Sequence, residues 1–190
     1  MRASIQAQTM IKNFESLKLK SYKCVPTEKL YTIGYGHYGV GKDLIITPHQ
    51  ADEFLLQDIE HAERSVNKYD SIYHFNQNQY DALVSFAFNV GSITQLASSG
   101  KRTKDEIGEC ILLYVKSSGK TLKGLQKRRA AERMLYTTPT AHESKTASQL
   151  AEEVIAGKWG TGAARKVRLE SYGYNYNDVQ AAVNKILARA

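Results

Sequence analysis

The sequence predicts an α+β protein that is mostly helical, with a small N-terminal β-hairpin lobe and a C-terminal three-helix bundle. Apolar and polar residues alternate over 17–21, and four glycines gather within 34–41, which is typical of a hairpin region. Beyond residue 47, apolar residues recur at helical spacing. A polar segment over 138–146 then divides the helical part of the chain in two, as a linker would.

The first part of the chain predicts a helix followed by strands. Residues 5–14 carry apolar side chains at helical spacing, so a short helix is expected there. Leu17 and Leu19 alternate with lysines, which is the period of a half-exposed strand. The β-prone run 30–35 leads into the glycine-rich segment, so a second strand and tight turns are expected up to Gly41.

Capping signals predict where the later helices begin and end. Thr47, Pro48 and Gln50 combine an N-cap, a proline in the first turn and a capping-box glutamine. The helices after this one are expected over 76–91, 103–119, 122–136, 148–156, 162–172 and 177–188. The expected organisation is a larger domain at 1–137, a linker at 138–146 and a three-helix module at 147–190.

The composition is that of a soluble globular protein with a basic surface. The 190 residues are 42% hydrophobic and 24% charged, with a formal net charge of +7. A basic balance favours an anionic partner, although a merely solvated surface explains the charge equally well. No apolar run approaches the ~18 residues of a membrane span, so no membrane insertion is expected.

The N-terminal residues and the cysteine content narrow the class of protein further. Residues 1–12 lack the apolar core and cleavage site of a secretion signal, so the protein is expected in the cytoplasm of the cell that makes it until it is released. Cys24 and Cys110 are too few for a disulfide scaffold and lack the paired spacing of a zinc site. We expect no metal and no cofactor. Without an interface signal, we also expect a monomer.

One acidic residue, Glu15, stands where the predicted first helix gives way to a strand. A carboxylate at such a junction can project into a cleft, and glycoside hydrolysis needs a proton donor for the leaving oxygen. Most glutamates are nevertheless ordinary surface residues. The surrounding sequence is what separates these two interpretations.

Several segments resemble phage lysozymes of glycoside hydrolase family 24, in the order in which that family carries them. They include FESLKLKSYKC at 14–24, LYTIGYGH at 30–37, QYDALVSFAFNVG at 79–91 and GLQKRRAAE at 124–132. The resemblance covers residues 5–137 and implies a lysozyme-like fold. It also implies an endolysin that lyses the host cell. Such an enzyme hydrolyses, with inversion, the β-1,4 bond between N-acetylmuramic acid and N-acetylglucosamine in bacterial peptidoglycan.

The same resemblance implies a catalytic set. The family uses a glutamate, an aspartate or cysteine, and a threonine, which match Glu15, Cys24 and Thr32. Glu15 would donate the proton, while Cys24 and Thr32 would assist the attacking water or the transition state. Cys24 has the alternative of a small apolar residue under the hairpin, and Thr32 that of an ordinary strand residue. Seven residues separate Cys24 from Thr32, slightly more than the family spacing.

Three further residues are candidates for substrate binding. His37 either lies beside the active site and orients a carboxylate or is a hydrogen-bonded structural histidine. Arg128 and Arg129 lie on one predicted helix. One of them is expected to pair with Glu15 or contact substrate, and the other to be a surface charge.

The C-terminal segment resembles a second family, the cell-wall-binding repeat of family 7, over residues 147–188. The similarity includes VIAGKWG at 154–160 and GYNYNDVQ at 173–180. It implies a three-helix module that binds the muropeptide of peptidoglycan, with Trp159, Arg165 and Tyr174 as candidate contacts. In so small a bundle, Trp159 and Tyr174 have the alternative of closing the core.

Two other classes of protein compete with the enzyme. One is a catalytically impaired peptidoglycan-binding protein on a lysozyme scaffold, which only the cysteine at position 24 supports. The other is a nucleic-acid-binding protein, which only the basic charge supports. Because the chain shows no nucleic-acid-binding motif, no nucleic-acid partner is expected.

Overall fold

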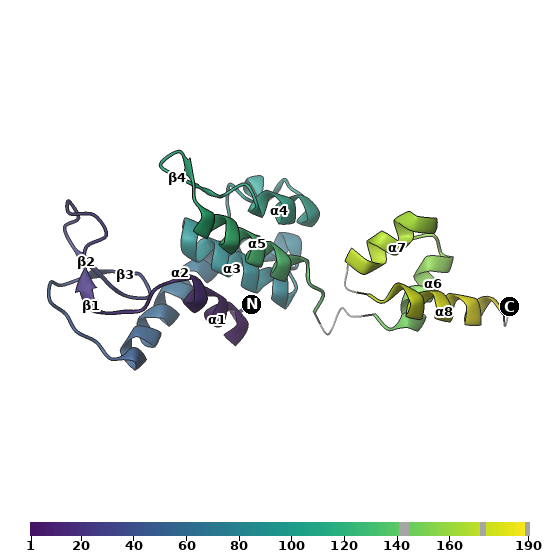
Figure 1. The fold of residues 1–190 in the computed structure, drawn as a ribbon, viewed down its shortest axis with the longest axis horizontal. Coiled ribbons are helices and arrows are strands. Elements are labelled where there is room, and N and C mark those ends of the chain that lie inside the picture. The colour runs from purple at the N-terminus through teal and green to yellow at the C-terminus, as the bar shows by residue number, and fades with distance from the viewer. Residues whose placement is uncertain (141–144, 172–173, 189–190) are drawn as a thin grey trace. The chain divides into compact units, whose positions relative to one another are not determined.

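The computed structural model describes residues 1–140, 145–171 and 174–188, and Figure 1 shows its elements. The chain divides into two compact units, Met1–Tyr136 and Thr137–Ala190. Each unit has its own hydrophobic core. We therefore describe each one separately.

The N-terminal unit begins with a helix and a small sheet. Ser4 caps the first helix, α1 (Ile5–Phe14), by accepting a hydrogen bond from the N–H of Gln6. A three-stranded antiparallel sheet follows, in the order β1-β2-β3. Its strands are β1 (Lys18–Tyr22), β2 (Tyr31–Gly34) and β3 (His37–Val40). The expected hairpin lobe is confirmed, since β2 and β3 form an antiparallel pair.

The remaining helices of this unit are α2 (Pro48–Tyr73), α3 (Gln77–Val90), α4 (Lys104–Ile111) and α5 (Lys123–Thr137), with a short 3-10 turn, η1 (Ser98–Gly100). Reciprocal capping boxes begin α2, α3 and α4. The predicted start at Thr47 is confirmed. Gly91 ends α3 in the left-handed region, where a glycine adopts its φ of 94° without steric cost.

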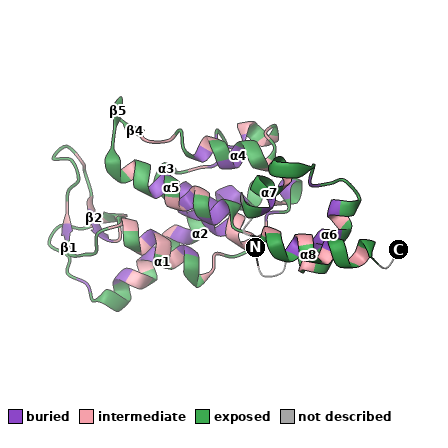
Figure 2. Ribbon diagram, turned by 45° about the vertical axis from the view of Figure 1, so that its right-hand side comes forward, coloured by how far each residue is buried: buried purple, intermediate pink, exposed green. Residues whose placement is uncertain are grey.

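The core of the unit is built around α3. Its side chains from Tyr80 to Ala87 are all buried, and those of Tyr80, Leu83 and Phe86 are among the largest fully buried groups. Figure 2 shows buried residues along α2, α3 and α5. A helix that is buried on all sides gives rigid support to the elements packed against it. This matters for function because α5 and the end of α1 both contact groups close to α3.

One boundary predicted from the sequence is wrong. The helix expected over 103–119 ends at Ile111, and a small antiparallel ribbon follows. The strands of this ribbon are β4 (Lys116–Ser117) and β5 (Lys120–Thr121). Its turn residues, Ser118 and Gly119, both have positive φ, which is the requirement of a tight two-residue hairpin. The apolar run through Val115 therefore fits helical spacing by coincidence.

The C-terminal unit is a bundle of α6 (Ala147–Ile155), α7 (Gly162–Ser171) and α8 (Tyr176–Leu187). Its core contains Leu150, Ala151, Val154, Trp159, Leu169, Val179 and Val183. The predicted fold class is confirmed for both units. No helix within the described ranges is long and apolar enough to cross a membrane.

Candidate active site

Glu15 is the residue at which α1 ends. Its backbone leaves the helical region (φ −102°, ψ 136°), while its N–H still donates to the carbonyl of Ile11 at 3.0 Å. A quarter of its side chain is exposed. Its Oε1 atom accepts a hydrogen bond from Nη1 of Arg128 at 2.5 Å. The carboxylate is therefore held from one side by a charged donor and open to solvent on another.

Arg128 lies on α5 and is almost completely buried. Besides Glu15, its Nη2 donates to the carbonyl of Ser85 at 3.1 Å and its Nε donates to Oε1 of Glu132 at 3.1 Å. The guanidinium also lies 5.5 Å from the centroid of the Phe14 ring. The expected pairing of one arginine with Glu15 is confirmed, and that arginine is Arg128. Because all three of its nitrogens are engaged, its position is tightly defined.

Cys24 and Thr32 meet at the end of β1. Thr32 on β2 is paired in register with Tyr22, and the chain then turns so that Sγ of Cys24 lies 3.7 Å from Oγ1 of Thr32. Cys24 is exposed, whereas Thr32 is buried. The alternative that Cys24 is an apolar residue under the hairpin is therefore wrong. Its thiol is available to solvent, and the threonine hydroxyl lies beside it.

A carboxylate closes the turn that carries Cys24. The Oε2 atom of Glu28 accepts hydrogen bonds from the N–H groups of Cys24, at 3.1 Å, and Val25, at 3.4 Å. The N–H of Glu28 in turn donates to the carbonyl of Val25 at 3.1 Å. This reciprocal arrangement stabilises the segment between Cys24 and Thr32.

Tyr22 connects the two halves of the site. Burial raises the pKa of its phenol, and smaller contributions in the same direction come from a hydrogen bond to Cys24 and from the charges of Cys24, Glu15 and Glu28. One phenol thus experiences both the candidate acid and the candidate thiol. Glu15 and Cys24 therefore both lie close enough to Tyr22 to influence its pKa.

His37 joins the sheet to α2. Its Nδ1 lies 3.1 Å from each carboxylate oxygen of Asp58, and its ring stacks on that of Phe54 with centroids 4.3 Å apart. The contact with Asp58 fits both interpretations, the structural histidine and the histidine that orients a carboxylate. The carboxylate that His37 orients is that of Asp58, not that of Glu15. A direct contact with substrate stays a prediction.

Arg129 has no exposed surface at all. Its Nη2 donates to Oδ1 of Asn89 at 2.8 Å, its Nε lies 3.0 Å from Oε2 of Glu132, and its guanidinium lies 4.6 Å from the centroid of the Phe86 ring. The expectation that the second arginine is a surface charge is therefore wrong. Its complete burial also contradicts a direct contact between Arg129 and substrate.

In the C-terminal unit, Trp159 belongs to the core. Only 9% of it is exposed, its Nε1 donates to Oε2 of Glu153 at 3.0 Å, and its ring meets the ring of Tyr174 edge to face at 6.0 Å between centroids. The core interpretation is confirmed for Trp159, and its assignment as a direct ligand contact is contradicted because little of the ring is accessible. Tyr174 is half-buried beside it.

Arg165 is the one predicted wall-binding residue that carries a charge, and it is half-buried. Its Nη2 donates to Oε1 of Gln180 on α8 at 2.8 Å, and its guanidinium lies 5.9 Å from the centroid of the Tyr176 ring. The ammonium of Lys166 lies 5.8 Å from the same ring. This end of α7 therefore combines two cations with an aromatic face.

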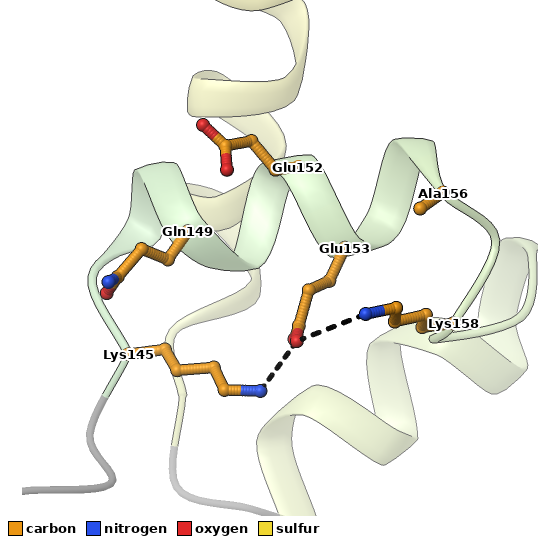
Figure 3. Close-up of a pocket in the computed structure, with 6 residues that line it drawn as sticks. All are labelled: Lys145, Gln149, Glu152, Glu153, Ala156 and Lys158. Carbon is orange, nitrogen blue, oxygen red and sulfur yellow. Dashed lines mark hydrogen bonds and ion pairs between the residues drawn. The ribbon is translucent and has the colours of Figure 1, made fainter.

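A separate cavity of about 450 Å³ lies along α6 (Figure 3). Its lining consists of Lys145, Gln149, Glu152, Glu153, Ala156 and Lys158. The carboxylate of Glu153 lies 2.7 Å from Nζ of Lys145 and 3.9 Å from that of Lys158, so this carboxylate pairs with both lysines of the lining. The predicted wall-binding residues do not line it.

Comparison with known families follows the division between the units. The phage lysozyme family matches residues 12–132, which is more than half of the chain. The chain belongs to the phage lysozyme family. The CW_7 repeat family matches residues 148–187 in the C-terminal unit.

Individual relatives agree with this assignment. The chain is 44% identical to the endolysin of Bacillus phage PZA over 149 residues, and 38% identical to the endolysin of Bacillus phage B103 over 175 residues. These alignments cover 74% and 87% of this chain. The matched parts make up 57% and 64% of those two proteins, respectively.

A solved structure shows that the fold extends over the whole phage lysozyme unit. The muramidase domain of SpmX from Asticaccaulis excentricus superposes with a TM-score of 0.62 and 29% identity. The superposition covers 73% of this chain and 99% of that domain. The lysozyme-like fold predicted from the sequence is confirmed.

Four residues of this candidate site were not predicted from the sequence. They are Tyr22, Glu28, Ser85 and Glu132. Tyr22, Ser85 and Glu132 lie within segments that resemble the family, but their types are common in ordinary strands and helices. Only the packing of distant segments shows that Glu132 and Ser85 bind Arg128, which in turn binds Glu15.

Proposed function

We propose that this chain is an endolysin that hydrolyses the β-1,4 bond between N-acetylmuramic acid and N-acetylglucosamine in peptidoglycan. The observation that carries the proposal is the position of Glu15, at the end of α1, with Arg128 on one carboxylate oxygen and Tyr22 and Cys24 nearby. A partly exposed carboxyl group at the junction of a helix and a strand can reach a glycosidic oxygen, as the general acid in glycoside hydrolysis must.

The two oxygens of Glu15 have different surroundings. Oε1 accepts the hydrogen bond from Arg128, which has no lone pair to offer and cannot accept a proton in return. The catalytic proton therefore resides on Oε2, from which it passes to the glycosidic oxygen as the bond to the anomeric carbon breaks. Arg128 also stabilises the carboxylate that remains after this transfer.

The Cys24–Thr32 pair supplies the second half of the reaction. The Thr32 hydroxyl holds the attacking water by a hydrogen bond, and Cys24 stabilises the positive charge that develops on the sugar or assists the water as a thiolate. Attack by a water from the face opposite to the leaving group gives inversion at the anomeric carbon.

The C-terminal module binds the wall and the N-terminal unit cuts it. Weak binding by the CW_7 repeat raises the local concentration of glycan strands around the tethered enzyme. The partner is bacterial peptidoglycan, reached after release from the cytoplasm of the infected host. Arg165 is the residue that we assign to recognition of a carboxylate or carbonyl group, since a guanidinium offers several donors in a fixed plane.

The decisive experiment measures bond cleavage directly. Purified peptidoglycan is incubated with the wild-type chain, Glu15→Gln and Cys24→Ser, and new reducing ends and free amines are quantified separately. We expect new reducing ends without new amines from the wild type, and none from Glu15→Gln. Amines without reducing ends would contradict a glycosidase. Binding to walls without any cleavage would favour the alternative, a catalytically impaired peptidoglycan-binding protein.

A further inference from the structure

A buried cluster of charges lies directly behind the Glu15–Arg128 pair. Its centre is the carboxylate of Glu132, which has no exposed surface. Oε1 of Glu132 accepts hydrogen bonds from Nε of Arg128 at 3.1 Å and from Oγ of Ser85 at 2.8 Å. Nη2 of Arg129 also reaches Oε1 at 3.3 Å, and its Nε lies 3.0 Å from Oε2. The carboxylate of Glu132 therefore contacts both Arg128 and Arg129.

The charge of this cluster is balanced only when Glu15 is included. Two guanidinium groups and one buried carboxylate carry a net charge of +1, and ionised Glu15 brings the sum to zero. On α3, the groups that contact the cluster, Ser85 and Asn89, are neutral. A buried net charge is costly. The charge on Glu132 therefore influences how readily Glu15 gives up its proton.

The geometry leaves Arg128 almost no freedom. Its Nε is bound by Glu132, its Nη2 by the carbonyl of Ser85, and only its Nη1 points at Glu15. The Phe14 ring lies against the guanidinium. Removing the carboxylate of Glu132 would release one edge of the guanidinium and would leave two buried cations compensated by Glu15 alone.

We infer that Glu132 is a positioning residue of the active site. It holds Arg128 on Oε1 of Glu15, and it offsets the charge of Arg129 so that Glu15 can carry a proton at the pH of the reaction. This inference rests on the proposed role of Glu15 as the general acid. The charged group in contact with Glu15 is Arg128 on α5, and the phenol of Tyr22 on β1 lies close enough for the charge of Glu15 to raise its pKa.

The sign of the effect follows from the charges. In Glu132→Gln, a negative charge disappears from the far side of Arg128, so the surroundings of Glu15 become more positive. Positive surroundings favour the ionised carboxylate, so Glu15 loses its proton at a lower pH. The alkaline limb of the pH–rate profile is expected to move about one pH unit to lower pH, the size of a Coulomb effect at an effective dielectric constant of about 20.

A double variant distinguishes an effect of net charge from an effect of lost contacts. Arg129→Met combined with Glu132→Gln removes one charge of each sign, so Arg128 and Glu15 again balance. We expect the alkaline limb of the double variant to return towards that of the wild type, although more contacts are lost than in the single variant. If Glu132 were merely a structural residue, the double variant would lose more activity than Glu132→Gln. The alkaline limb of its pH–rate profile would then not move back towards that of the wild type.

The test therefore measures pH–rate profiles for the wild type, Glu132→Gln and the double variant, using new reducing ends from peptidoglycan. Glu109→Gln is the matched control, because Glu109 also pairs with an arginine of α5, Arg133, but its side chain is exposed. We expect its profile to coincide with that of the wild type. A folded Glu132→Gln with an unmoved alkaline limb would overturn the inference. If Glu132→Gln does not fold, a double variant whose limb lies far from that of the wild type would also overturn it.

A second measurement keeps this inference distinguishable from the proposed function. The side-chain carboxyl carbons are labelled with carbon-13, and the resonance of Glu15 is assigned by its loss in Glu15→Gln and followed by NMR as pH is varied. A midpoint that moves down in Glu132→Gln and back in the double variant supports the role of Glu132 even if the wild type cleaves no peptidoglycan. An unchanged midpoint contradicts it even if the enzyme is active.

Discussion

Nη1 of Arg128 lies 2.5 Å from Oε1 of Glu15, although 113 positions separate the two residues in the sequence. The contact joins the end of α1 to the middle of α5. Both helices also contact the buried helix α3, α1 through its N-cap Ser4 and Asp81, and α5 through Arg128 and Ser85. The candidate acid of this chain is thus held by a residue that belongs to the last helix of the N-terminal unit.

Replacing Arg128 is expected to damage both stability and activity. In Arg128→Met the buried carboxylate of Glu132 loses one of its two guanidinium partners, and breaking such a buried pair costs about 3–5 kcal/mol of unfolding free energy. Urea denaturation measures this loss. Cleavage of peptidoglycan at a temperature where the variant is folded should fall at least about 100-fold, comparable to the loss of a preorganised charged donor.

The control for this prediction is Arg133→Met on the same helix. Arg133 pairs with exposed Glu109, and exposed ion pairs contribute about 0–1 kcal/mol. If the two substitutions destabilised the protein equally, the importance assigned to the buried cluster would be wrong.

Alkylation of Cys24 is expected to abolish cleavage. Cys24 is exposed whereas Cys110 is half-buried, so iodoacetamide should modify Cys24 first. The added group would occupy the space beside the Thr32 hydroxyl, where we place the attacking water. Mass spectrometry identifies the modified residue, and the count of new reducing ends reports the activity.

Cys24→Ser and Cys24→Asp complete this test. The serine variant should resist inactivation and cleave about ten-fold or more slowly than the wild type. The aspartate variant should retain activity, because the family resemblance allows an aspartate at this position. Full activity after stoichiometric alkylation of Cys24 would exclude the thiol from the reaction.

The stability of the C-terminal unit should depend on pH through Glu153. A hydrogen bond from Lys145 and a second one from Trp159 lower the pKa of Glu153. The ionised carboxylate therefore stabilises the folded state above the unfolded-state pKa of about 4.3, and this contribution is lost as pH falls through the lower folded-state value.

Fluorescence isolates this effect, because Trp159 is the single tryptophan of the chain and lies in this unit. From pH 7 to pH 3, the midpoint of thermal unfolding of the wild type should fall by about 5 °C more than that of Glu153→Gln, which corresponds to about 1 kcal/mol. Glu152→Gln on the same helix should behave like the wild type. Equal pH dependence in the wild type and Glu153→Gln would contradict the prediction.

Substitution of Arg165 is expected to weaken wall binding without affecting catalysis. Arg165→Gln removes the charge beside the Tyr176 ring while keeping a polar side chain next to Gln180. Sedimentation with purified walls, measured in a Glu15→Gln background so that the walls stay intact, should show about ten-fold weaker binding. Lys185→Gln, an exposed substitution on α8, is the matched control, and equal binding by both variants would remove Arg165 from the recognition surface.

Much of this molecule could be predicted from local patterns. Helix starts at Thr47, Asn76 and Thr103 followed from capping chemistry, since a cap depends on residues three positions apart. The end of the third of these helices could not be predicted in the same way. Apolar spacing continues past Ile111, and the positive φ of Ser118 and Gly119 becomes visible only in the folded chain.

For the site, the sequence by itself determined the family, the candidate residues Glu15, Cys24 and Thr32, and the presence of the CW_7 repeat. Only the tertiary structure decided that Arg128, and not Arg129, reaches Glu15. Adjacent residues on a helix point about 100° apart, and no local pattern states which direction faces Glu15. The packing of α5 against α3 resolves this, because it turns Arg129 towards Asn89 and Phe86 and leaves one nitrogen of Arg128 directed at the carboxylate.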